Sequence, residues 1–312
     1  MDGYILSVTL NPAIDKTIKL KQLVLGEDHR CNQTFYSAGG KGINVSRALQ
    51  KLGVCTLSTG FLGGPAGEYI KSQLHKEKII GDFVEIAGET RTSFTMIDTS
   101  TGKLTRVLEE GPRISRRERM RFKEKFIDLI KSCRIVVLSG RNISGAGEAF
   151  YRELTKIAQG KNKKVVLDTS GKPLFLGLQA KPFLIKPNLQ EMEFLLQQRV
   201  MTISQIKKAM TCLFKKGVGN IIISLGRKGA VGSDGENFWL ASPPKKNTIN
   251  TVGCGDALVA GFLYAYTRGK GFKSCLQFGV ATGSANALNL QPGLLKKREL
   301  AKLLHKVEMR NF

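Results

Sequence analysis

The chain is poor in the side chains that build metal centres and disulfide frameworks. Its 312 residues include one tryptophan, three histidines and six cysteines, and the cysteines lack the paired short spacings of a zinc site. We therefore expect no zinc centre, and thiols that stay reduced as in a cytoplasmic protein. No apolar run approaches the ~20 residues of a membrane span, and residues 1–10 lack the basic and apolar regions of a signal peptide. The expected location is cytoplasmic, with no membrane partner.

Acidic residues are also scarce, since 25 Asp and Glu stand against 49 Lys and Arg and leave a net charge of +24. This balance makes a nucleic-acid-binding protein an alternative to consider. The densest basic stretch, residues 113–125, is interleaved with apolar positions such as Met120 and Phe122, as on the solvated face of a helix. No zinc spacing or RNA-reading aromatic run accompanies it. We expect no specific nucleic-acid partner, and a positive field that favours small anionic ligands.

An ordinary P-loop is missing, because the chain contains no Gly-x-x-x-x-Gly-Lys-Ser/Thr motif. The segment Asn250–Gly261 instead places an acid behind two glycines, in the order Gly253, Cys254, Gly255 and Asp256. Glycines let the backbone approach a ligand, and the free amides of a helix start form an anion hole. Asp256 can there accept a proton from a hydroxyl while the amides stabilise a transferring phosphoryl group. The alternative is that Asp256 only complements the helix dipole.

A second glycine cluster also opens a predicted helix. Gly39, Gly40 and Lys41 precede Asn44, and the apolar residues that follow have helical spacing: Val45, Ala48, Leu49 and Leu52, with Gly53 as a stop. Lys41 and Asn44 therefore lie at the mouth of the helix, where they can hold a sugar hydroxyl or a phosphate. The alternative for Lys41 is a solvated surface lysine.

Apolar runs that alternate with helical patterns predict an α/β fold in one domain over residues 1–312. The expected buried strands are Tyr4–Leu10, Val54–Gly60, Arg134–Ser139, Lys164–Asp168, Phe183–Lys186 and Asn220–Leu225. The expected helices include Gly67–Lys76, Ser115–Lys131, Glu148–Gln159, Ser204–Lys216, Asp256–Arg268 and Lys297–Lys306. Ligands of such sheets bind beyond the carboxyl ends of the strands, where Gly60, Ser139, Asp168, Lys186 and Ser224 are expected to gather. Two strand-like segments without helical partners, residues 16–35 and 92–108, are interpreted as a lid.

The two glycine clusters, in this order, resemble the two signatures of the ribokinase-like sugar kinase family, also called the PfkB family. The resemblance runs almost end to end, through Thr9–Asp15, Gly88–Arg91, Leu138–Gly140, Asp168–Gly171, Ile185–Glu191 and Ser224–Gly229. It implies a three-layer αβα sandwich with a mainly parallel sheet and a small β-sheet lid, the cofactors ATP and Mg²⁺, and a homodimer formed through the lid. The motifs are most similar to those of 1-phosphofructokinases and tagatose-6-phosphate kinases. Fructose 1-phosphate is therefore the expected substrate, with tagatose 6-phosphate as the alternative.

The resemblance also implies roles for individual residues. The sugar phosphate would contact Asp15, Gly39, Gly40, Lys41, Asn44, Arg91 and Ser139, with Arg91 gripping its phosphate. ATP would contact Lys186, Asn188, Ser224, Gly226, Gly229 and Gly255, and magnesium would be organised by Asn188 and Glu191. Simpler local interpretations stay open, namely a surface salt bridge at Arg91, a hairpin turn at residues 226–229 and a helix cap at Asn188 and Glu191.

Two positions depart from the family pattern. Cys254 stands where alanine or serine is more common, and we treat it as a small residue, although a helix N-terminus can lower a thiol pKa and make it sensitive to oxidants. Arg141 and Asn142 follow Ser139 and Gly140 where relatives usually carry a serine, an aliphatic residue and a proline. This second departure leaves the substrate detail open.

Overall fold

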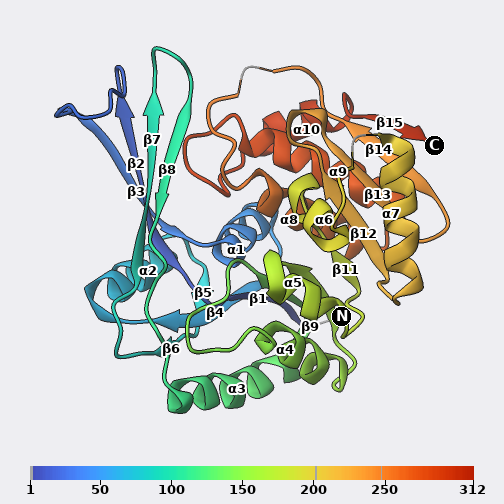
Figure 1. Cartoon of the computed structure of the whole chain (residues 1–312), viewed down its shortest axis with the longest axis horizontal. Helices are drawn as coiled ribbons and strands as arrows, with labels where there is room; N and C mark the ends of the chain where they lie inside the picture. Colours follow the sequence, from blue (N-terminus) through green and yellow to red (C-terminus); the bar gives the residue numbers. More distant parts are fainter. Residues whose placement is uncertain (1–2, 201, 247) are drawn as a thin grey trace.

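A large, mostly parallel sheet runs through the middle of the molecule (Figure 1). The structure is a computed structural model that describes residues 3–200, 202–246 and 248–312. Within these residues the sheet has 11 strands in the order β15-β14-β13-β12-β11-β10-β9-β1-β4-β5, with β6 also paired to β4. The strands are β1 (Tyr4–Thr9), β4 (Thr56–Leu62), β5 (Ile80–Gly81), β6 (Val84–Glu85), β9 (Cys133–Ser139), β10 (Lys164–Asp168), β11 (Leu184–Ile185), β12 (Asn220–Ser224), β13 (Ala230–Ser233), β14 (Phe238–Ser242) and β15 (Glu308–Asn311).

Helices cover both faces of this sheet, because alternate residues of each strand point to opposite sides. In β9, Val136 and Leu138 pack into one core and Ile135 and Val137 into the other. The first core is closed by α3 (Arg116–Lys131), α4 (Phe150–Gln159), α5 (Gly171–Leu178), α6 (Leu189–Leu196) and α7 (Ile203–Lys215). The second is closed by α1 (Lys41–Leu52), α8 (Cys254–Tyr266), α9 (Phe272–Asn286) and α10 (Lys297–Leu304). Helix α2 (Gly64–Lys76) packs on a smaller third core. The predicted three-layer αβα sandwich is confirmed.

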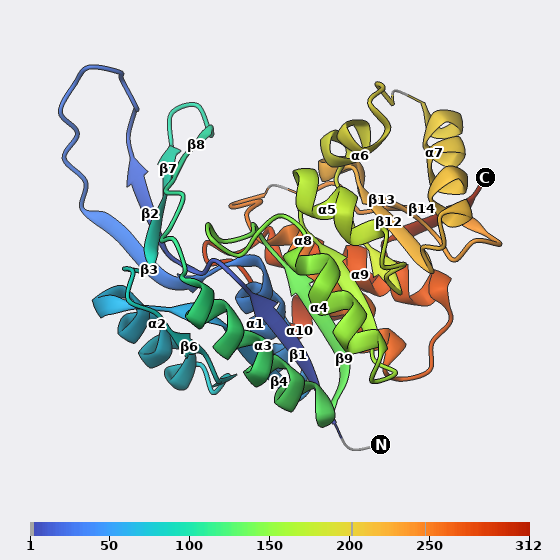
Figure 2. The same ribbon diagram turned by 60° about the horizontal axis from the view of Figure 1, so that its bottom comes forward.

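A separate four-stranded sheet stands away from the main body at one end (Figures 1 and 2). Its order is β3 (Gln33–Gly39), β2 (Ala13–Leu20), β7 (Arg91–Asp98) and β8 (Leu104–Leu108). The predicted small sheet is confirmed, but its predicted boundaries are wrong at the base. Strand β2 pairs with β7 from Ala13 onward and with β3 up to Gly39. These ladder hydrogen bonds take Asp15 and Gly39 into the sheet, and residues 21–32 form a connection instead of a strand.

The predicted core elements occur where the periodicity places them. Strand β10 matches its predicted range, and α1 ends at Gly53, whose φ of 81° is left-handed. The sequence patterns do not predict α5, α9 or the strands β5, β6, β14 and β15. Helix α9 is rich in small residues and shows no clear apolar stripe. Residues 226–229 form a short 3-10 turn between β12 and the antiparallel β13, so the hairpin interpretation of this segment is correct. In the described part of the chain, no helix combines the length and apolar character needed to cross a membrane.

The carboxyl ends of the parallel strands meet at one edge of the main sheet. Strand register sets Thr9 beside Gly60 and Ser139 beside Asp168. Further along the edge, Asn188 forms a bridge with Ser224. The predicted gathering of strand ends is therefore confirmed, and the N-termini of α1 and α8 lie against the same edge.

Candidate functional site

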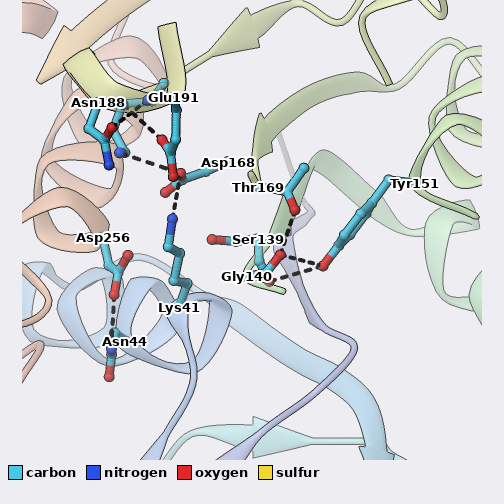
Figure 3. A network of polar contacts seen from close by, with 11 residues as sticks. Lys41, Asn44, Ser139, Gly140, Tyr151, Asp168, Thr169, Asn188, Glu191 and Asp256 are labelled. Carbon is cyan, nitrogen blue, oxygen red and sulfur yellow. Dashed lines mark hydrogen bonds and ion pairs between the residues drawn. The ribbon is translucent and has the colours of Figure 1, made fainter. Parts of the chain in front are cut away.

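Asp256 lies in the first turn of α8, and the local sequence explains this position. The helix begins after Gly253, which has a φ of 78°, and a Cβ atom at Gly253 would lie 2.7 Å from the Cβ of Pro292. A glycine is therefore required there. The Asp256 side chain is turned inward, the residue is only 5% exposed, and its Oδ2 accepts a hydrogen bond of 2.8 Å from the Nδ2 of Asn44 (Figure 3). This contact joins the two glycine-led helices that lie 212 residues apart.

Burial gives this carboxyl the properties of a base. Desolvation and the nearby charge of Asp168 raise the pKa of Asp256 to about 6, while Lys41, the Asn44 hydrogen bond and Lys186 act in the opposite direction. An acid that only complements a helix dipole is exposed and has a lowered pKa. Asp256 is instead ionised at neutral pH and more basic than an ordinary carboxylate, as general-base catalysis requires.

Asp168, at the end of β10, holds two lysines next to this acid. Its Oδ1 lies 3.0 Å from the Nζ of Lys41 and 3.4 Å from the Nζ of Lys186, and the Asp168 side chain is fully buried. Burial raises the pKa of Asp168, but Lys186 and Lys41 outweigh it and hold the pKa below the ordinary value. Desolvation lowers the pKa of Lys41, yet Asp168, Asp256 and Glu191 together raise it. Lys186 also reaches α8, since a Cβ at Gly255 would lie 3.1 Å from its Nζ.

The turn after β9 presents a hydroxyl to the same region. Ser139 is fully buried, and its Oγ has no hydrogen-bond partner within the described residues. The carbonyl of the next residue, Gly140, accepts hydrogen bonds from Thr169 Oγ1 at 2.7 Å and from the Tyr151 hydroxyl at 3.1 Å (Figure 3). These bonds fix the turn, and the buried Ser139 Oγ is a hydroxyl whose expected polar partner is missing among the described residues.

The glycines before α1 make room for Asp15 and for the turn into the helix. A Cβ at Gly39 would lie 2.3 Å from the Cγ of Asp15. Gly40 has a φ of 121°, and a Cβ there would lie 2.6 Å from Thr9 Cγ2. Burial raises the pKa of Asp15, while Arg106, Arg47 and Arg91 lower it. This half-buried acid, with the charges of three arginines nearby, can accept a hydrogen bond from a hydroxyl.

Arg91 begins β7 at the base of the small sheet and is held by backbone and side-chain oxygens. Its Nε and Nη2 donate to the Asn11 carbonyl oxygen at 3.3 and 3.2 Å, and its Nη1 donates to the Glu109 carbonyl oxygen at 3.0 Å. The interpretation of Arg91 as part of a surface salt bridge therefore does not describe its guanidinium, which is partly buried and fixed by these hydrogen bonds. Desolvation, Arg141 and Arg106 lower the pKa of Arg91 and outweigh its acidic neighbours. Three arginines from different segments therefore share this region.

Asn188 and Glu191 form a reciprocal capping box at the start of α6. Asn188 Oδ1 accepts from the Glu191 amide at 2.8 Å, and Glu191 Oε2 accepts from the Asn188 amide at 2.8 Å. The helix-cap interpretation is correct, and it fixes Glu191 near Lys41, whose pKa it raises. No three His, Cys, Asp or Glu side chains converge to hold a metal in residues 3–200, 202–246 and 248–312.

A cavity of about 610 Å³ adjoins the strand ends and contains three of the predicted nucleotide residues, Asn188, Ser224 and Gly226, in its wall. Its apolar lining includes Val200, Ile203, Ile206 and Leu225. Gly229 closes the nearby turn with a φ of 95°, and a Cβ there would lie 2.0 Å from the Ala241 carbonyl oxygen. Within the described residues, no hydrogen bond or ion pair links Ser224, Gly226 or Gly229 directly to Asp256.

Cys254 does not have the activated thiol that a helix N-terminus can produce. Burial raises the pKa of Cys254 to about 11. A hydrogen bond from Asn286 lowers this pKa, whereas the charge of Asp256 raises it. The Asn286 Nδ2 lies 3.4 Å from the sulfur. The expectation of a small, unreactive residue fits this environment, whereas oxidant sensitivity does not.

Sequence reasoning missed two residues of the site. The sequence places Asp168 at the strand edge but gives it no role, because a single acid after a strand does not reveal its partners. Arg47 is only 1% exposed and donates to Asn44 Oδ1 at 2.9 Å, to the Ala38 carbonyl at 2.6 Å and to Glu77 Oε2 at 2.6 Å. The local signal is weak, because Arg47 lies three residues after Asn44 but outside the apolar stripe of Val45, Ala48 and Leu49. Through these bonds Arg47 braces the amide that contacts Asp256.

Comparison with known proteins agrees with this geometry. Residues 8–296 match the sequence profile described as pfkB family carbohydrate kinase. The chain is 37% identical to 1-phosphofructokinase of Borreliella burgdorferi, covering 99% of each chain, and 33% identical to tagatose-6-phosphate kinase of Staphylococcus epidermidis, covering 98% of this chain and 99% of that protein.

Solved structures show the same fold. A crystal structure of a possible 1-phosphofructokinase from Thermotoga maritima has a TM-score of 0.91 at 27% identity, covering 99% of both chains. Phosphofructokinase-2 from Escherichia coli, in complex with substrates and products, has a TM-score of 0.92 at 27% identity, covering 97% of this chain and 99% of that one. On the sequence match, the shared fold and the buried acid at the helix start, this chain belongs to the pfkB family of carbohydrate kinases.

Proposed function

We propose that the protein transfers the γ-phosphoryl group of ATP to a free hydroxyl of a ketohexose monophosphate, with fructose 1-phosphate as the substrate and fructose 1,6-bisphosphate as the product. The observation that carries this proposal is the buried carboxyl of Asp256 at the start of α8, held by Asn44 and next to two lysines. This arrangement supplies a base and positive charge at one point, as phosphoryl transfer requires.

In the proposed reaction, Asp256 accepts the proton of the attacking hydroxyl. Its raised pKa of about 6 keeps it ionised at neutral pH while making it a better acceptor than an exposed aspartate. The Cys254 amide donates to the Thr251 carbonyl at 3.4 Å. The backbone amides of Gly253, Gly255 and Asp256, at the start of α8, would donate to the phosphoryl oxygens. Lys41 and Lys186 add positive charge on the side of Asp168. Transfer of the phosphoryl group then leaves the proton on Asp256 and the negative charge on ADP.

Magnesium is part of this proposal because the fixed carboxylate of Glu191 faces the charge cluster around Lys41. Asn188 and Glu191 would hold the hydrated ion, which would neutralise the phosphate charges of ATP. ATP itself would lie along the strand edge, with Lys186, Gly255, Ser224, Gly226 and Gly229 beside it. The cavity of about 610 Å³ next to this edge supports that placement.

The sugar phosphate would lie on the other side, under the small sheet. Asp15, with the backbone of Gly39 and Gly40, would orient the sugar hydroxyls, while Arg91, with Lys41 or Ser139, would bind the existing phosphate. The unpartnered, buried Ser139 Oγ and the position of Arg91 at the base of the small sheet, near Asp15, support this. Both sides of the Asn44 amide are engaged, by Asp256 and by Arg47, so its main role in the proposal is to orient the base.

Tagatose 6-phosphate is the second candidate substrate, because one full-length relative is a tagatose-6-phosphate kinase at 33% identity. Both sugars are phosphorylated ketohexoses, and the residues named above recognise features that the two share. The additional charge of Arg141 near Arg91 is the feature of this chain that could discriminate between them.

The test is ADP release by the purified protein with magnesium and ATP, and with fructose 1-phosphate, tagatose 6-phosphate, fructose 6-phosphate or fructose in separate reactions. We expect turnover with fructose 1-phosphate, a loss of about 10²–10⁴-fold in Asp256→Asn, and a raised KM for the sugar phosphate in Arg91→Ala. Near-normal turnover in Asp256→Asn would refute the proposed base. A preference for unphosphorylated fructose would refute the proposed substrate class.

We also propose that two copies associate through the small sheet, with each lid strand pair packed on its counterpart. Tyr36 and Val107 are exposed by 51% and 52%, and strand register places both in one row with Phe94 on the same face of this sheet. Exposed apolar side chains gathered on one face are typical of a protein interface. The test is light scattering during gel filtration of Tyr36→Ser with Val107→Ser. The control is Met120→Ser, which removes an equally exposed apolar residue from α3. A control that dissociates as readily, or a wild type that is monomeric, would contradict the proposal.

A further inference from the structure

The carboxylate of Asp168 occupies the centre of the site, and the site itself gives it no direct role toward a substrate, because its side-chain contacts are with two lysines. It lies at the end of β10, fully buried, and joins a lysine from the start of α1 to a lysine that follows β11 (Figure 3). Its Oδ1 takes both contacts, at 3.0 Å and 3.4 Å, and its Oδ2 has no hydrogen-bond partner among the described residues. The backbone of Asp168 is fixed as well, because its carbonyl accepts from the Gly140 amide at 3.0 Å.

The Lys186 side chain is 4% exposed and the Lys41 side chain 37%, so their two ammonium groups would repel each other if no counter-ion lay between them. A single carboxylate between them offsets this repulsion and keeps them together. Removal of the Asp168 carboxylate would therefore change the electrostatic environment of Lys41, of Lys186 and of the base Asp256. This role differs from that of a substrate contact, since Asp168 acts through other residues.

We propose that Asp168 is a positioning residue for phosphoryl transfer: its carboxylate pairs Lys41 with Lys186 beside α8 and sets the electrostatic balance in which Asp256 works as the base. The inference rests on the proposed function, because it assumes that Asp256 is the base. It adds to that function a residue that controls the strength of the base and the placement of both lysines.

Five groups act on Asp256 and determine its charge balance. From β10 comes Asp168, which favours the protonated form of Asp256, and from α1 come Lys41 and Asn44, which favour the ionised form. Lys186, after β11, also favours the ionised form. On α8 itself, the neighbouring thiol of Cys254 is protonated at neutral pH, because burial raises its pKa to about 11. Loss of Asp168 therefore removes the one anion among these groups.

The test compares pH profiles of kcat/KM for the sugar phosphate in three proteins. In the wild type, activity is expected to fall as the pH drops through about 6, where Asp256 becomes protonated. In Asp168→Asn, turnover should fall. The acid limb of the profile, where activity is lost as the pH drops, should move to lower pH by about half a unit or more. In Lys41→Met the limb should move the other way, to higher pH, because a cation that favours the ionised base is gone. The control is Asp128→Asn, which removes the same charge from a side chain that is 71% exposed on α3.

The opposite shifts separate this inference from a merely structural role, which would lower turnover without moving the limb. An unmoved limb in Asp168→Asn, or in Lys41→Met where Asp168→Asn does not fold, overturns the inference. A defect in Asp168→Asn that excess magnesium repairs also overturns it, because Asp168 would then act as a metal ligand. If Asp256→Asn retains turnover, the proposed function fails. An inactive Asp256→Asn with an unshifted Asp168→Asn profile overturns only the role of Asp168.

Discussion

Replacement of Asp256 by asparagine should make the protein less active and more stable at the same time. The pKa of this carboxyl rises from 3.8 to about 6 on folding, mainly because the side chain is buried. The folded state therefore prefers the protonated, neutral form. Asparagine is neutral at every pH, has the same shape, and can still accept the hydrogen bond that Asn44 donates.

The size of the effect follows from the pKa difference. About two pKa units correspond to about 3 kcal/mol, since each unit is 1.36 kcal/mol. Because the folded pKa is the higher one, the contribution of this group to wild-type stability is fully present below pH 3.8 and is lost as the pH rises through about 6. Above pH 6 the ionised, buried Asp256 destabilises the wild type by that amount. The variant lacks this cost, and for a chain of this size the gain corresponds to about 5 °C in Tm.

The measurement is urea unfolding of both proteins at several pH values between about 5 and about 8, without ligands. We expect the free energy of unfolding of Asp256→Asn to exceed that of the wild type at the upper end, and the difference to shrink toward the lower end. A difference that does not change with pH, or a variant that is less stable above pH 7, would refute the assignment of a raised pKa to Asp256. A loss of ADP release in Asp256→Asn, measured on the same protein samples, identifies Asp256 as the base.

Three further outcomes are expected. Arg47→Met should lower the free energy of unfolding by about 3–5 kcal/mol, because it leaves the Glu77 carboxylate without its buried partner; urea unfolding measures this, with the exposed Arg310→Met as a nearly neutral control. Gly39→Ala should raise the KM for the sugar phosphate but not for ATP. The new Cβ would lie 2.3 Å from the Cγ of Asp15 and would displace the Asp15 carboxylate; steady-state kinetics measure this. Cys254→Ala should retain turnover, and mass spectrometry should show that Cys254 is alkylated more slowly than the exposed cysteines, since burial raises its pKa to about 11.

The controls decide between local and general effects. Gly271→Ala has open space around its Cβ, so a KM change in this variant equal to that of Gly39→Ala would contradict the collision with Asp15. A stability loss in Arg310→Met equal to that of Arg47→Met would indicate a general effect of removing positive charge. Rapid alkylation at Cys254, comparable with that of the exposed Cys31, would contradict its high pKa.

The layered core could be predicted from sequence because its signals are local. The helical spacing of Val45, Ala48 and Leu49 and the left-handed glycine at position 53 define α1 without reference to the rest of the chain. The same is true of the glycines before Asp256, which require a helix start at that point. The lid boundaries were less predictable, because strand ends depend on partners. Asp15 belongs to the lid sheet only because β3 and β7 flank it.

The sequence by itself determined the αβα layers, the two glycine-led helix starts and the presence of an acid at the start of α8, since backbone conformation and apolar periodicity specify these over a few neighbouring residues. Only the tertiary structure decided the chemical state of that acid. Asn44 meets Asp256 across 212 residues, and Lys41 meets Asp168 across 127. Charges and burial act through space, so a pKa depends on groups that the folded chain brings together and that no local pattern reveals.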